Sequence, residues 1–400
     1  MNSEIITAFA PAEFGTYVKR FCLLSVGLLG TIGSFNYIVD PYLIHQWETP
    51  LVQRLRPTRE KLSPWGKTYA IAKYKPSIVY VGNSRTEVGL PTQFEPFSGK
   101  RVFNAALSGG SLGDAIAMAK HAASINHLDT VVWGIDYPSF SPTVGNTDFD
   151  RELVADKRGY SFRRAVLNIK RGLTVDMTED SAKLLLGSFG EVCRSSLAFY
   201  GQRDEACFIA IFKSGGGLAK SVEREIKKFV QEDPSAESAV EELNLAVKEM
   251  CNADTQLRLY INPTHAVMVD ALFWAGKWDA MEAWQRRLVK VVEFNRQSGC
   301  DIRLFDFAGF NSITTDIIPQ TSNGVMENYW ETSHYRPNVG TMILNRMFAI
   351  NDPSVPNDFG IELNSEMLPA HLARMRLDRD QYHASHPVET QLVKRITSSL

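Results

Sequence analysis

The sequence predicts an α/β domain built on a parallel sheet, with a helical insertion in it and one transmembrane helix before it. Short strand-like runs alternate with helical runs along the 400-residue chain, and this alternation is typical of a parallel sheet covered by helices. The strand-like runs are almost continuously apolar, as strands buried on both faces are. An uncharged, largely apolar segment, residues 21–39, lies near the N-terminus. We therefore expect a three-layer domain behind a membrane helix.

The composition describes an ordinary globular protein. Hydrophobic residues make up 44% and charged residues 22% of the chain, and the formal net charge is -2. A chain without a basic excess lacks the charge expected of a nucleic-acid-binding protein, so we expect no nucleic-acid partner. The sequence contains no His-x-His, Cys-x-x-Cys or Walker-type motif, and we therefore expect neither a metal nor a nucleotide cofactor.

Residues 21–40 are the expected transmembrane anchor. The apolar stretch is long enough to cross the hydrocarbon core of a membrane once, and Asp40-Pro41-Tyr42 is typical of a helix end at the interface. A cleaved signal peptide is an alternative, although no clear cleavage site of small residues follows. A buried helix of a soluble protein is a third interpretation.

Basic residues on both sides of this segment bear on its orientation. Lys19 and Arg20 precede it and predict a cytoplasmic N-terminus. Four basic residues follow it and weaken that prediction, namely Arg54, Arg56, Arg59 and Lys61. We expect residues 1–20 to lie in the cytoplasm and the main domain to lie outside it.

The rest of the chain divides into a linker, a body and a tail. Residues 41–75 are rich in proline, arginine and tryptophan and show little periodicity, so we expect a linker. Residues 76–350 form the expected α/β domain. Residues 351–400 are polar and interrupted by prolines, which predicts a peripheral tail with a short helix near residues 371–379.

Five strands and three helices are expected to alternate along residues 76–350. The strands are expected at Ser77–Gly82, Arg101–Ala105, Asp129–Asp136, Gln256–Asn262 and Asp301–Phe307. The helices are expected at Asp114–Ser124, Met281–Gln297 and Pro337–Phe348. Helices that cross over between successive strands would make the strands parallel, and we expect these crossovers to be right-handed.

Residues 145–254 interrupt this alternation of strands and helices, because they contain few strand-like runs and several helical ones. Leu153–Arg171 is basic on one side, and Ser221–Gln231 and Glu237–Met250 are amphipathic. We expect a helical insertion that could cover the crevice at the sheet edge. Its basic patch is expected to be a solvated helix face, and contact with anionic lipid or polysaccharide is the alternative.

The cysteines leave the disulfide pattern open. Cys22 lies in the apolar segment, and the other four, at positions 193, 207, 251 and 300, could pair in three ways. In an exported domain the expected local bridge joins Cys193 and Cys207. Four buried free thiols are the alternative.

Ser84 is the candidate nucleophile. It follows the first predicted strand, at the edge of the sheet where the loops of an open α/β fold leave a crevice. A serine hydroxyl is a poor nucleophile at neutral pH and needs a base and a group that orients the base. Glu331 and His334, three residues apart, have the right chemistry. The amides of Ser84 and of Gly109 or Gly110 could bind an oxyanion.

Each of these residues also has a structural interpretation. Ser84 could cap the helix that follows, His334 could be a hydrogen-bonded structural histidine, and Glu331 could be solvated. The glycines at 109 and 110 could serve only a turn. The functional interpretation rests on joint placement, because Ser84, the glycine turn, Asp136, His265 and His334 all follow predicted strand ends on one edge of the sheet.

Four segments resemble the SGNH (GDSL-like) hydrolase superfamily. They are Gly82-Asn83-Ser84-Arg85, Asn104 to Gly110, Gly134-Ile135-Asp136 and Glu331-Thr332-Ser333-His334, in this order. More narrowly, the chain is similar to the membrane-anchored envelope branch related to alginate O-acetyltransferase and D-alanyl-transfer proteins. The resemblance covers residues 76–349 without the insertion. It implies a flavodoxin-like fold, Ser84 as nucleophile, His334 as base, Glu331 as orienting acid and Gly109 or Gly110 as an amide donor.

Two positions depart from the family pattern. The acid is usually aspartate in the family and is Glu331 here. Asp136 stands where the family has an oxyanion-binding asparagine, and its carboxylate would oppose a developing oxyanion. We hypothesise that Asp136 turns away and pairs with Arg85, or stabilises the strand end, which would leave Asn83 or Asn104 near the pocket.

His265 is a further candidate for binding an acyl or sugar oxygen. It ends the segment Asn262-Pro263-Thr264-His265, which follows the fourth predicted strand. A structural histidine in a loop stopped by proline is the alternative.

These expectations combine into a function. The residues and the resemblance imply a serine-dependent O-acyltransferase or esterase that acts on a cell-envelope or exopolysaccharide glycan through an acyl-Ser84 intermediate. The expected setting is the inner membrane, with a single pass and the main domain on the periplasmic side. Expected partners are the glycan or acyl donor and an envelope acylation or polysaccharide machinery. The alternative is a catalytically impaired SGNH-like scaffold or glycan-binding component, which Asp136 favours.

Overall fold

The computed structural model describes residues 11–47, 62–137, 149–188, 197, 199–203, 218–231, 236–251, 254–319 and 324–400. The chain forms two compact units, one of residues 1–59 with 161–190 and one of residues 60–160 with 191–400. Several residues used above lie outside the described ranges, namely Cys193, Cys207, Arg54, Arg56, Arg59 and Lys61.

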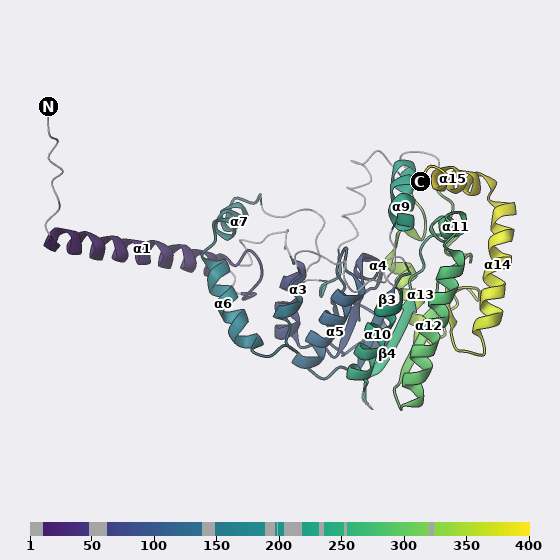
Figure 1. The fold of residues 1–400 in the computed structure, drawn as a ribbon, viewed down its shortest axis with the longest axis horizontal. Helices are drawn as coiled ribbons and strands as arrows, with labels where there is room; N and C mark the ends of the chain where they lie inside the picture. The colour runs from purple at the N-terminus through teal and green to yellow at the C-terminus, as the bar shows by residue number, and fades with distance from the viewer. Residues whose placement is uncertain are drawn as a thin grey trace. The chain divides into compact units, whose positions relative to one another are not determined.

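A six-stranded sheet forms the core of the second unit (Figure 1). Its order is β2 (Val102–Asn104), β1 (Ile78–Val81), β3 (Thr130–Ile135), β4 (Gln256–Ile261), β5 (Ile302–Asp306) and β8 (Ile361–Glu362). The first five strands are parallel, and β8 pairs antiparallel with β5. All five predicted strands are present, and the expectation of a mostly parallel α/β sheet is confirmed.

The helices that connect the strands cover the sheet. One layer contains α5 (Leu112–Ile125), α10 (Ala236–Met250) and α12 (Trp278–Gln297), and α10 contacts both of the others. The short helix α4 (Ser84–Gly89) follows β1 and packs against α13 (Pro337–Met347). Because parallel crossovers are right-handed, this strand order places α4 and α13 on the opposite face from the α5 layer.

The chain reverses direction across the sheet at β1, because β2 lies on one side of β1 and β3 on the other. In open α/β sheets the carboxyl ends of strands at such a reversal border the ligand crevice. Ser84 follows β1 and Asp136 follows β3, so both lie at this point. The topology therefore places the candidate nucleophile where sites of this fold class occur.

Two glycines permit the close packing of α4. A Cβ atom on Gly340, in α13, would lie 1.9 Å from the Gly89 carbonyl oxygen. A Cβ atom on Gly89 would lie 2.0 Å from the ring of Tyr335. Neither position can hold a larger residue without a shift of backbone or ring, so these glycines bring the Ser84 helix against the C-terminal part of the chain.

The expected insertion, residues 145–254, does not form one cap. Residues 161–190 belong to the unit of the N-terminal helix. Helix α9 (Leu218–Gln231) contacts α11 (Ala266–Trp274) and the strand β6 (Tyr329–Glu331). Helix α10 belongs to the connection between β3 and β4, and it packs in the helical layer with α5 and α12. The sequence pattern showed amphipathic helices, but not which surface each one covers.

The linker and the tail are also more ordered than expected. Within residues 41–75, α3 (Pro64–Tyr74) packs on α5 and has Lys67 and Ile71 buried. Residues 351–400 contribute β8, α14 (Leu368–Ser385) and α15 (Pro387–Thr397). Leu368, Leu372 and Met375 are buried along one side of α14. Short apolar stripes within polar sequence therefore attach both segments to the domain.

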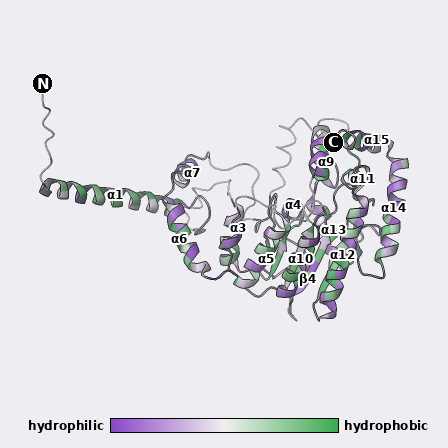
Figure 2. Cartoon of the chain, viewed as in Figure 1, coloured by the Kyte–Doolittle hydropathy of each residue, from purple (hydrophilic) through white to green (hydrophobic). Residues whose placement is uncertain are grey.

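The first unit contains the apolar helix. Helix α1 (Pro11–Val39) is long and apolar enough from Phe14 to Val39 to cross a membrane (Figure 2). Most of its exposed side chains are hydrophobic between residues 14 and 30. Helices α6 (Tyr160–Gly172) and α7 (Val175–Leu185) complete this unit, and short 3-10 helices occur elsewhere at Glu95–Phe97 and Arg151–Leu153.

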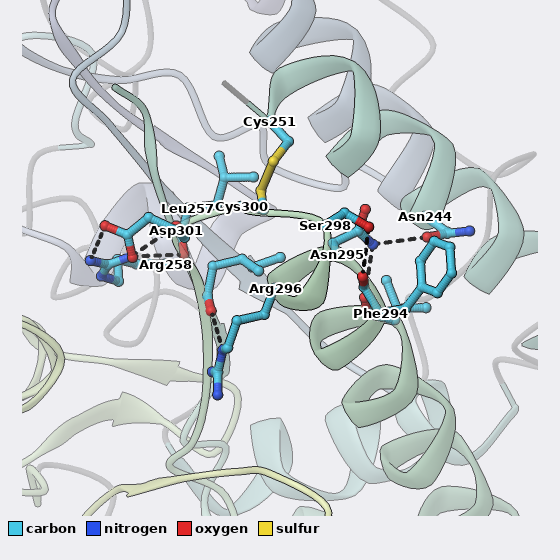
Figure 3. Close-up of a disulfide and its surroundings, with 12 residues drawn as sticks. Asn244, Cys251, Leu257, Arg258, Phe294, Asn295, Arg296, Ser298, Cys300 and Asp301 are labelled. Atoms are coloured by element: carbon cyan, nitrogen blue, oxygen red, sulfur yellow. Dashed lines mark hydrogen bonds and ion pairs between the residues drawn. A yellow bond between two sulfur atoms is a disulfide. The ribbon is translucent and has the colours of Figure 1, made fainter. Parts of the chain in front are cut away.

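One disulfide is present among the described residues, between Cys251 and Cys300 (Figure 3). It joins the end of α10 to the segment just before β5. The expected Cys193–Cys207 bridge lies outside the described residues. The long sequence separation of 49 residues explains why a search for local pairs did not single out Cys251 and Cys300.

Candidate active site

Ser84 is the first residue of α4, directly after the turn that ends β1. Gly82 has φ of +147°, and a Cβ atom there would lie 2.6 Å from the Thr86 hydroxyl oxygen, so glycine is needed at this turn. Asn83 is the N-cap, because its side-chain oxygen accepts the Arg85 N–H at 3.0 Å. The alternative in which Ser84 itself caps the helix is therefore wrong. Its hydroxyl is available for other contacts.

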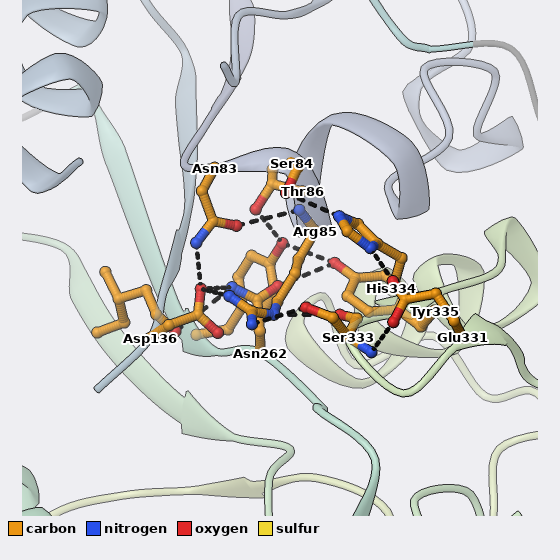
Figure 4. A network of polar contacts seen from close by, with 12 residues as sticks. Asn83, Ser84, Arg85, Thr86, Asp136, Asn262, Glu331, Ser333, His334 and Tyr335 are labelled. Carbon is orange, nitrogen blue, oxygen red and sulfur yellow. Dashed lines mark hydrogen bonds and ion pairs between the residues drawn. The ribbon is translucent and has the colours of Figure 1, made fainter. Parts of the chain in front are cut away.

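Ser84, His334 and Glu331 form a continuous hydrogen-bond chain (Figure 4). The Ser84 hydroxyl donates to Nε2 of His334 at 2.8 Å. The Nδ1 N–H of His334 donates to Oε1 of Glu331. Glu331 ends β6 and His334 begins β7 (His334–Tyr335), so a tight antiparallel hairpin presents base and acid together. This is the arrangement in which a carboxylate fixes the tautomer of a histidine that can accept a serine proton.

Glu331 is held in its ionised form. Its side chain is 7% exposed, and burial alone would raise its pKa above the ordinary value of 4.5. Charge and hydrogen bonding from His334, the Ser333 N–H at 2.7 Å and the charge of Arg85 outweigh burial and lower the pKa. The extra methylene of glutamate is accommodated because the hairpin turns within two residues, Thr332 and Ser333.

Arg85 links the helix that begins with Ser84 to the hairpin that carries Glu331 and His334. Its Nε donates to the Ser333 carbonyl oxygen at 3.1 Å and its Nη2 to the Ser333 hydroxyl at 2.8 Å. Its third nitrogen, Nη1, lies 3.4 Å from Asp136. The guanidinium is 7% exposed and lies 5.7 Å from the ring centre of Phe229 on α9. Arg85 therefore uses its three nitrogens in contacts with Ser333 and Asp136, and it holds the hairpin that carries Glu331 and His334.

Asp136 has the cationic partner that its position requires. It is 5% exposed, and its Oδ2 also accepts Nδ2 of Asn83 at 2.6 Å and Nδ2 of Asn262 at 3.0 Å. The hypothesis that Asp136 pairs with Arg85 is therefore confirmed. Asp136 does not turn away from the strand ends, however, because it lines a cavity of about 20 Å³ between the ends of β1 and β3, together with Gly82, Asn83 and Gly110. A space of this size holds about one water molecule.

Asn104 and His265 have structural contacts in place of the expected substrate contacts. Asn104 is fully buried, and its Nδ2 donates to the Thr86 carbonyl oxygen at 2.9 Å, near the end of α4. His265 is 1% exposed and caps α11, and its Nε2 donates to the Asp316 carbonyl oxygen at 2.6 Å. Both side chains are therefore used in hydrogen bonds to backbone groups.

The two glycine candidates differ in their amides. The Gly110 N–H donates to the Leu107 carbonyl oxygen at 2.8 Å, which removes it as an oxyanion donor in this conformation. Gly109 has φ of +69° and is exposed. The Ser84 N–H has no acceptor within α4, because it belongs to the first residue of that helix. Ser84 and Gly109 are therefore the two amides that remain as candidates.

A chain of buried hydroxyls beneath the triad was not predicted. Thr86, on α4, contacts the Tyr260 hydroxyl at 2.9 Å, which contacts the Tyr335 hydroxyl at 3.0 Å. Tyr335 donates to Asn262 Oδ1 at 3.1 Å, and Asn262 reaches Asp136. Burial raises the pKa of both phenols, so they stay protonated. Apolar strand patterns gave no signal for this network, since tyrosine is common in strands.

A buried ion pair fixes the loop that carries Gly109. Lys67 is 1% exposed, and its Nζ donates to Glu87 at 2.8 Å and to the Ala106 carbonyl oxygen at 2.6 Å. The Ser108 hydroxyl donates to the other oxygen of Glu87. Although burial would raise the pKa of Glu87, Lys67 and Arg203 lower it to about 2. Residues 106–108 are thereby tied to α4, the helix that begins with Ser84.

The described residues contain no cluster of three or more histidine, cysteine or acidic side chains suited to a metal ion. The functional side chains at this edge of the sheet are a hydroxyl, an imidazole, carboxylates and a guanidinium. Among the described residues, the arrangement is suited to proton transfer and acyl chemistry on the serine.

His265 should make stability depend on pH. Burial lowers its pKa from 6.5 to about 4, although the Asp316 contact acts in the opposite direction. As the pH falls from 6.5 to about 4, His265 binds a proton in the unfolded chain but not in the folded protein. The free energy of unfolding therefore falls by roughly 3 kcal/mol in total over this pH range. Urea denaturation at several pH values between these limits would measure the loss. His265→Asn should show a smaller pH dependence, and an identical dependence in both proteins would contradict this assignment.

No protein-family model matches this sequence, and no curated protein matches it. The functional proposal therefore rests on the geometry of the site.

Proposed function

We propose that this protein is a serine-dependent acyl-group enzyme, an O-acyltransferase or esterase that works through an acyl-Ser84 intermediate. The observation that supports the proposal most directly is the hydrogen-bond chain from Glu331 through His334 to Ser84. The SGNH-like order of the segments and the position of Ser84 at the β1/β3 reversal also support it. A purely structural histidine would not require both partners in this order.

The reaction begins with attack of Ser84 Oγ on the acyl carbon of an ester or thioester. The Oγ proton passes to Nε2 of His334, and Glu331 stabilises the resulting imidazolium. The amides of Ser84 and Gly109 would bind the oxyanion. The bond to the leaving group breaks as His334 returns the proton to the departing oxygen or sulfur. The product is acyl-Ser84.

The second half of the reaction releases the acyl group. A water molecule or a sugar hydroxyl gives its proton to His334 and attacks the acyl carbon, and Ser84 Oγ leaves and takes that proton back. Attack by water is hydrolysis, and attack by a sugar hydroxyl is transfer. Exclusion of water from the crevice favours transfer. Helix α9, which contacts β6, is the described element that covers this side of the triad.

The proposed setting is the inner membrane of a cell envelope. Helix α1 would be a single-pass anchor, and the catalytic domain would face the periplasm, where envelope and exopolysaccharide glycans are acylated. The apolar length of α1 supports the anchor, and Lys19 and Arg20 before it support this orientation. The Cys251–Cys300 disulfide also supports an oxidising compartment.

A second candidate is a scaffold or glycan-binding component that has lost efficient catalysis. The observation that favours it is Asp136, because a carboxylate stands at the end of β3 next to the cavity lined by Gly110. Arg85 offsets this charge at 3.4 Å, and two side-chain amides also donate to it. An enzyme is therefore the stronger proposal.

Fluorophosphonate labelling tests the proposal. The full-length protein should react covalently at Ser84, because the probe needs a serine activated by a base. Ser84→Ala should abolish labelling, and Ser298→Ala, at an exposed serine that ends α12, should leave it unchanged. Circular dichroism would establish that each variant is folded. A folded wild-type protein that takes up no probe would favour the scaffold.

A further inference from the structure

The C-terminal end of α1 is built around a buried polar residue. Asn36 lies in the apolar helix but is fully buried. Its Nδ2 donates to the Gly172 carbonyl oxygen and to the Thr178 hydroxyl, both at 2.9 Å, and its Oδ1 accepts the Ser181 hydroxyl at 2.9 Å. All three partners belong to α6, α7 or the residues around them. This end of α1 is therefore joined specifically to the α6–α7 pair.

The turn between α6 and α7 reaches back along α1. The Leu173 side chain is in contact with Gly33, since a Cβ atom on that glycine would lie 3.4 Å from Leu173 Cδ2. Gly33 precedes the end of α1 at Val39 by six residues, or about 9 Å of helix. If Lys19 and Arg20 mark the cytoplasmic interface, the segment from Phe21 to Val39 is about 28 Å long and matches one hydrocarbon core. Leu173 would then lie on the membrane side of Val39.

Helix α6 has an exposed apolar stripe that leads to this turn. Phe162 is 75% exposed and Ile169 is 67% exposed, and their spacing of seven residues puts them on one side of the helix. Val175, just after the turn, is 79% exposed. Large apolar side chains at this level of exposure are unfavourable in water, and the turn that follows α6 contacts α1 through Leu173.

The charge of α6 matches a lipid surface. The helix contains four basic residues, Arg163, Arg164, Lys170 and Arg171, and no acidic residue. Arg164 is buried and does not contribute to the surface, whereas Lys170 is exposed. Arg163 and Lys170 follow Phe162 and Ile169 directly, so they lie beside the apolar stripe. Acidic residues of this unit lie on α7 and at the two ends of α1, at Glu13 and Asp40. On α7, Asp180 binds the Tyr42 hydroxyl at 2.7 Å and Glu179 pairs with Lys183. An apolar stripe bordered by basic side chains is typical of helices that lie in a membrane interface.

We propose that α6 and the α6–α7 turn lie in the interfacial region of the same membrane that α1 crosses. Phe162, Ile169, Leu173 and Val175 enter the boundary between headgroups and acyl chains, and Arg163 and Lys170 contact anionic phospholipid headgroups. The reach of about 9 Å along α1 agrees with the 5–10 Å depth at which such helices bury their apolar face. The inference rests on the membrane anchoring in the proposed function.

Lipid-based fluorescence quenching tests this surface. Single cysteines would be introduced at Ile169, Val175, Glu179 and Val26 in the full-length protein, with Cys22, Cys193 and Cys207 replaced by serine. Each would carry a bimane label, in vesicles that contain phosphatidylglycerol and either brominated lipid or external iodide. Glu179 is the matched control, because it is exposed on α7 but acidic. Val26 reports on the middle of α1.

The outcomes separate the membrane anchoring of α1 from the interfacial position of α6. Labels at 169 and 175 should lose most of their fluorescence to brominated lipid and little to iodide, while the label at 179 should show the reverse. If labels at 169, 175 and 179 all respond to iodide while the label at 26 responds to brominated lipid, α1 is a membrane helix and the interfacial surface is refuted. If the label at 26 also responds to iodide, the anchor itself is refuted, and the inference with it.

Discussion

Replacing His334 with alanine is expected to lower the rate of fluorophosphonate labelling at Ser84, and any ester turnover, by about 10⁴-fold or more. The Ser84 hydroxyl would lose the base that lies 2.8 Å away, and the unassisted hydroxyl is a poor nucleophile at neutral pH. Glu331→Gln should have a smaller but still large effect, of roughly 10²-fold or more, because it keeps the shape and loses the charge that orients His334.

The matched control for His334 is His371. His371 lies on α14, and its Nε2 contacts the buried carboxylate of Asp306 at 2.8 Å. Asp306 is the last residue of β5. His371→Ala removes a histidine–aspartate pair of the same kind outside the Ser84 network. Labelling should therefore stay near the wild-type rate in this variant. A His334→Ala protein that is labelled as fast as the wild type would show that the hydrogen-bond chain does not activate Ser84.

Replacing Arg85 with alanine is expected to destabilise the folded protein by about 3–5 kcal/mol, since the change leaves the buried carboxylate of Asp136 without its cation. It also removes both side-chain donors that hold Ser333 in the hairpin. Labelling at Ser84 should therefore fall even under conditions where the variant is folded. Urea denaturation measures the first effect, and the labelling rate in the absence of urea measures the second.

Arg85→Lys separates charge from geometry. Lysine keeps a cation near Asp136 but cannot supply three nitrogens in the planar arrangement of a guanidinium. It should recover much of the stability and little of the labelling rate. Arg374→Ala is the exposed control, because the Arg374–Asp378 pair lies on the surface of α14 and should contribute little to stability. If Arg85→Lys labels as fast as the wild type, Arg85 does not position the triad through its contacts with Ser333.

The sequence predicted the parts of the fold that depend on local pattern. Continuous apolar runs located all five parallel strands to within one residue at most ends, because burial on both faces leaves few polar positions. The N-terminal helix was predicted from its length and its uncharged apolar run. Ser84 and His334 were selected because both follow predicted strand ends, although they are 250 residues apart. Glu331 was selected because it lies three residues before His334.

Contacts between distant segments could not be read from the sequence. The insertion was treated as one cap, but its helices contact three different surfaces, and only packing decides which surface an amphipathic helix covers. Asn104 and His265 were assigned to a pocket because they lie at strand ends. In the structure their side chains donate hydrogen bonds to backbone carbonyl oxygens instead. The Lys67–Glu87 pair and the tyrosine hydroxyl chain had no sequence signal, because each joins residues from different elements.

The sequence by itself therefore determined an α/β chain with an apolar N-terminal helix and a serine at the carboxyl end of its first strand. Local periodicity and strand-end chemistry are sufficient for that much, since both depend on neighbouring residues. Only the tertiary structure decided that Asn83 caps α4 and leaves the Ser84 hydroxyl to His334, and that Arg85 neutralises Asp136 while it holds the hairpin. These contacts depend on the directions of side chains brought together by folding, which no single stretch of sequence specifies.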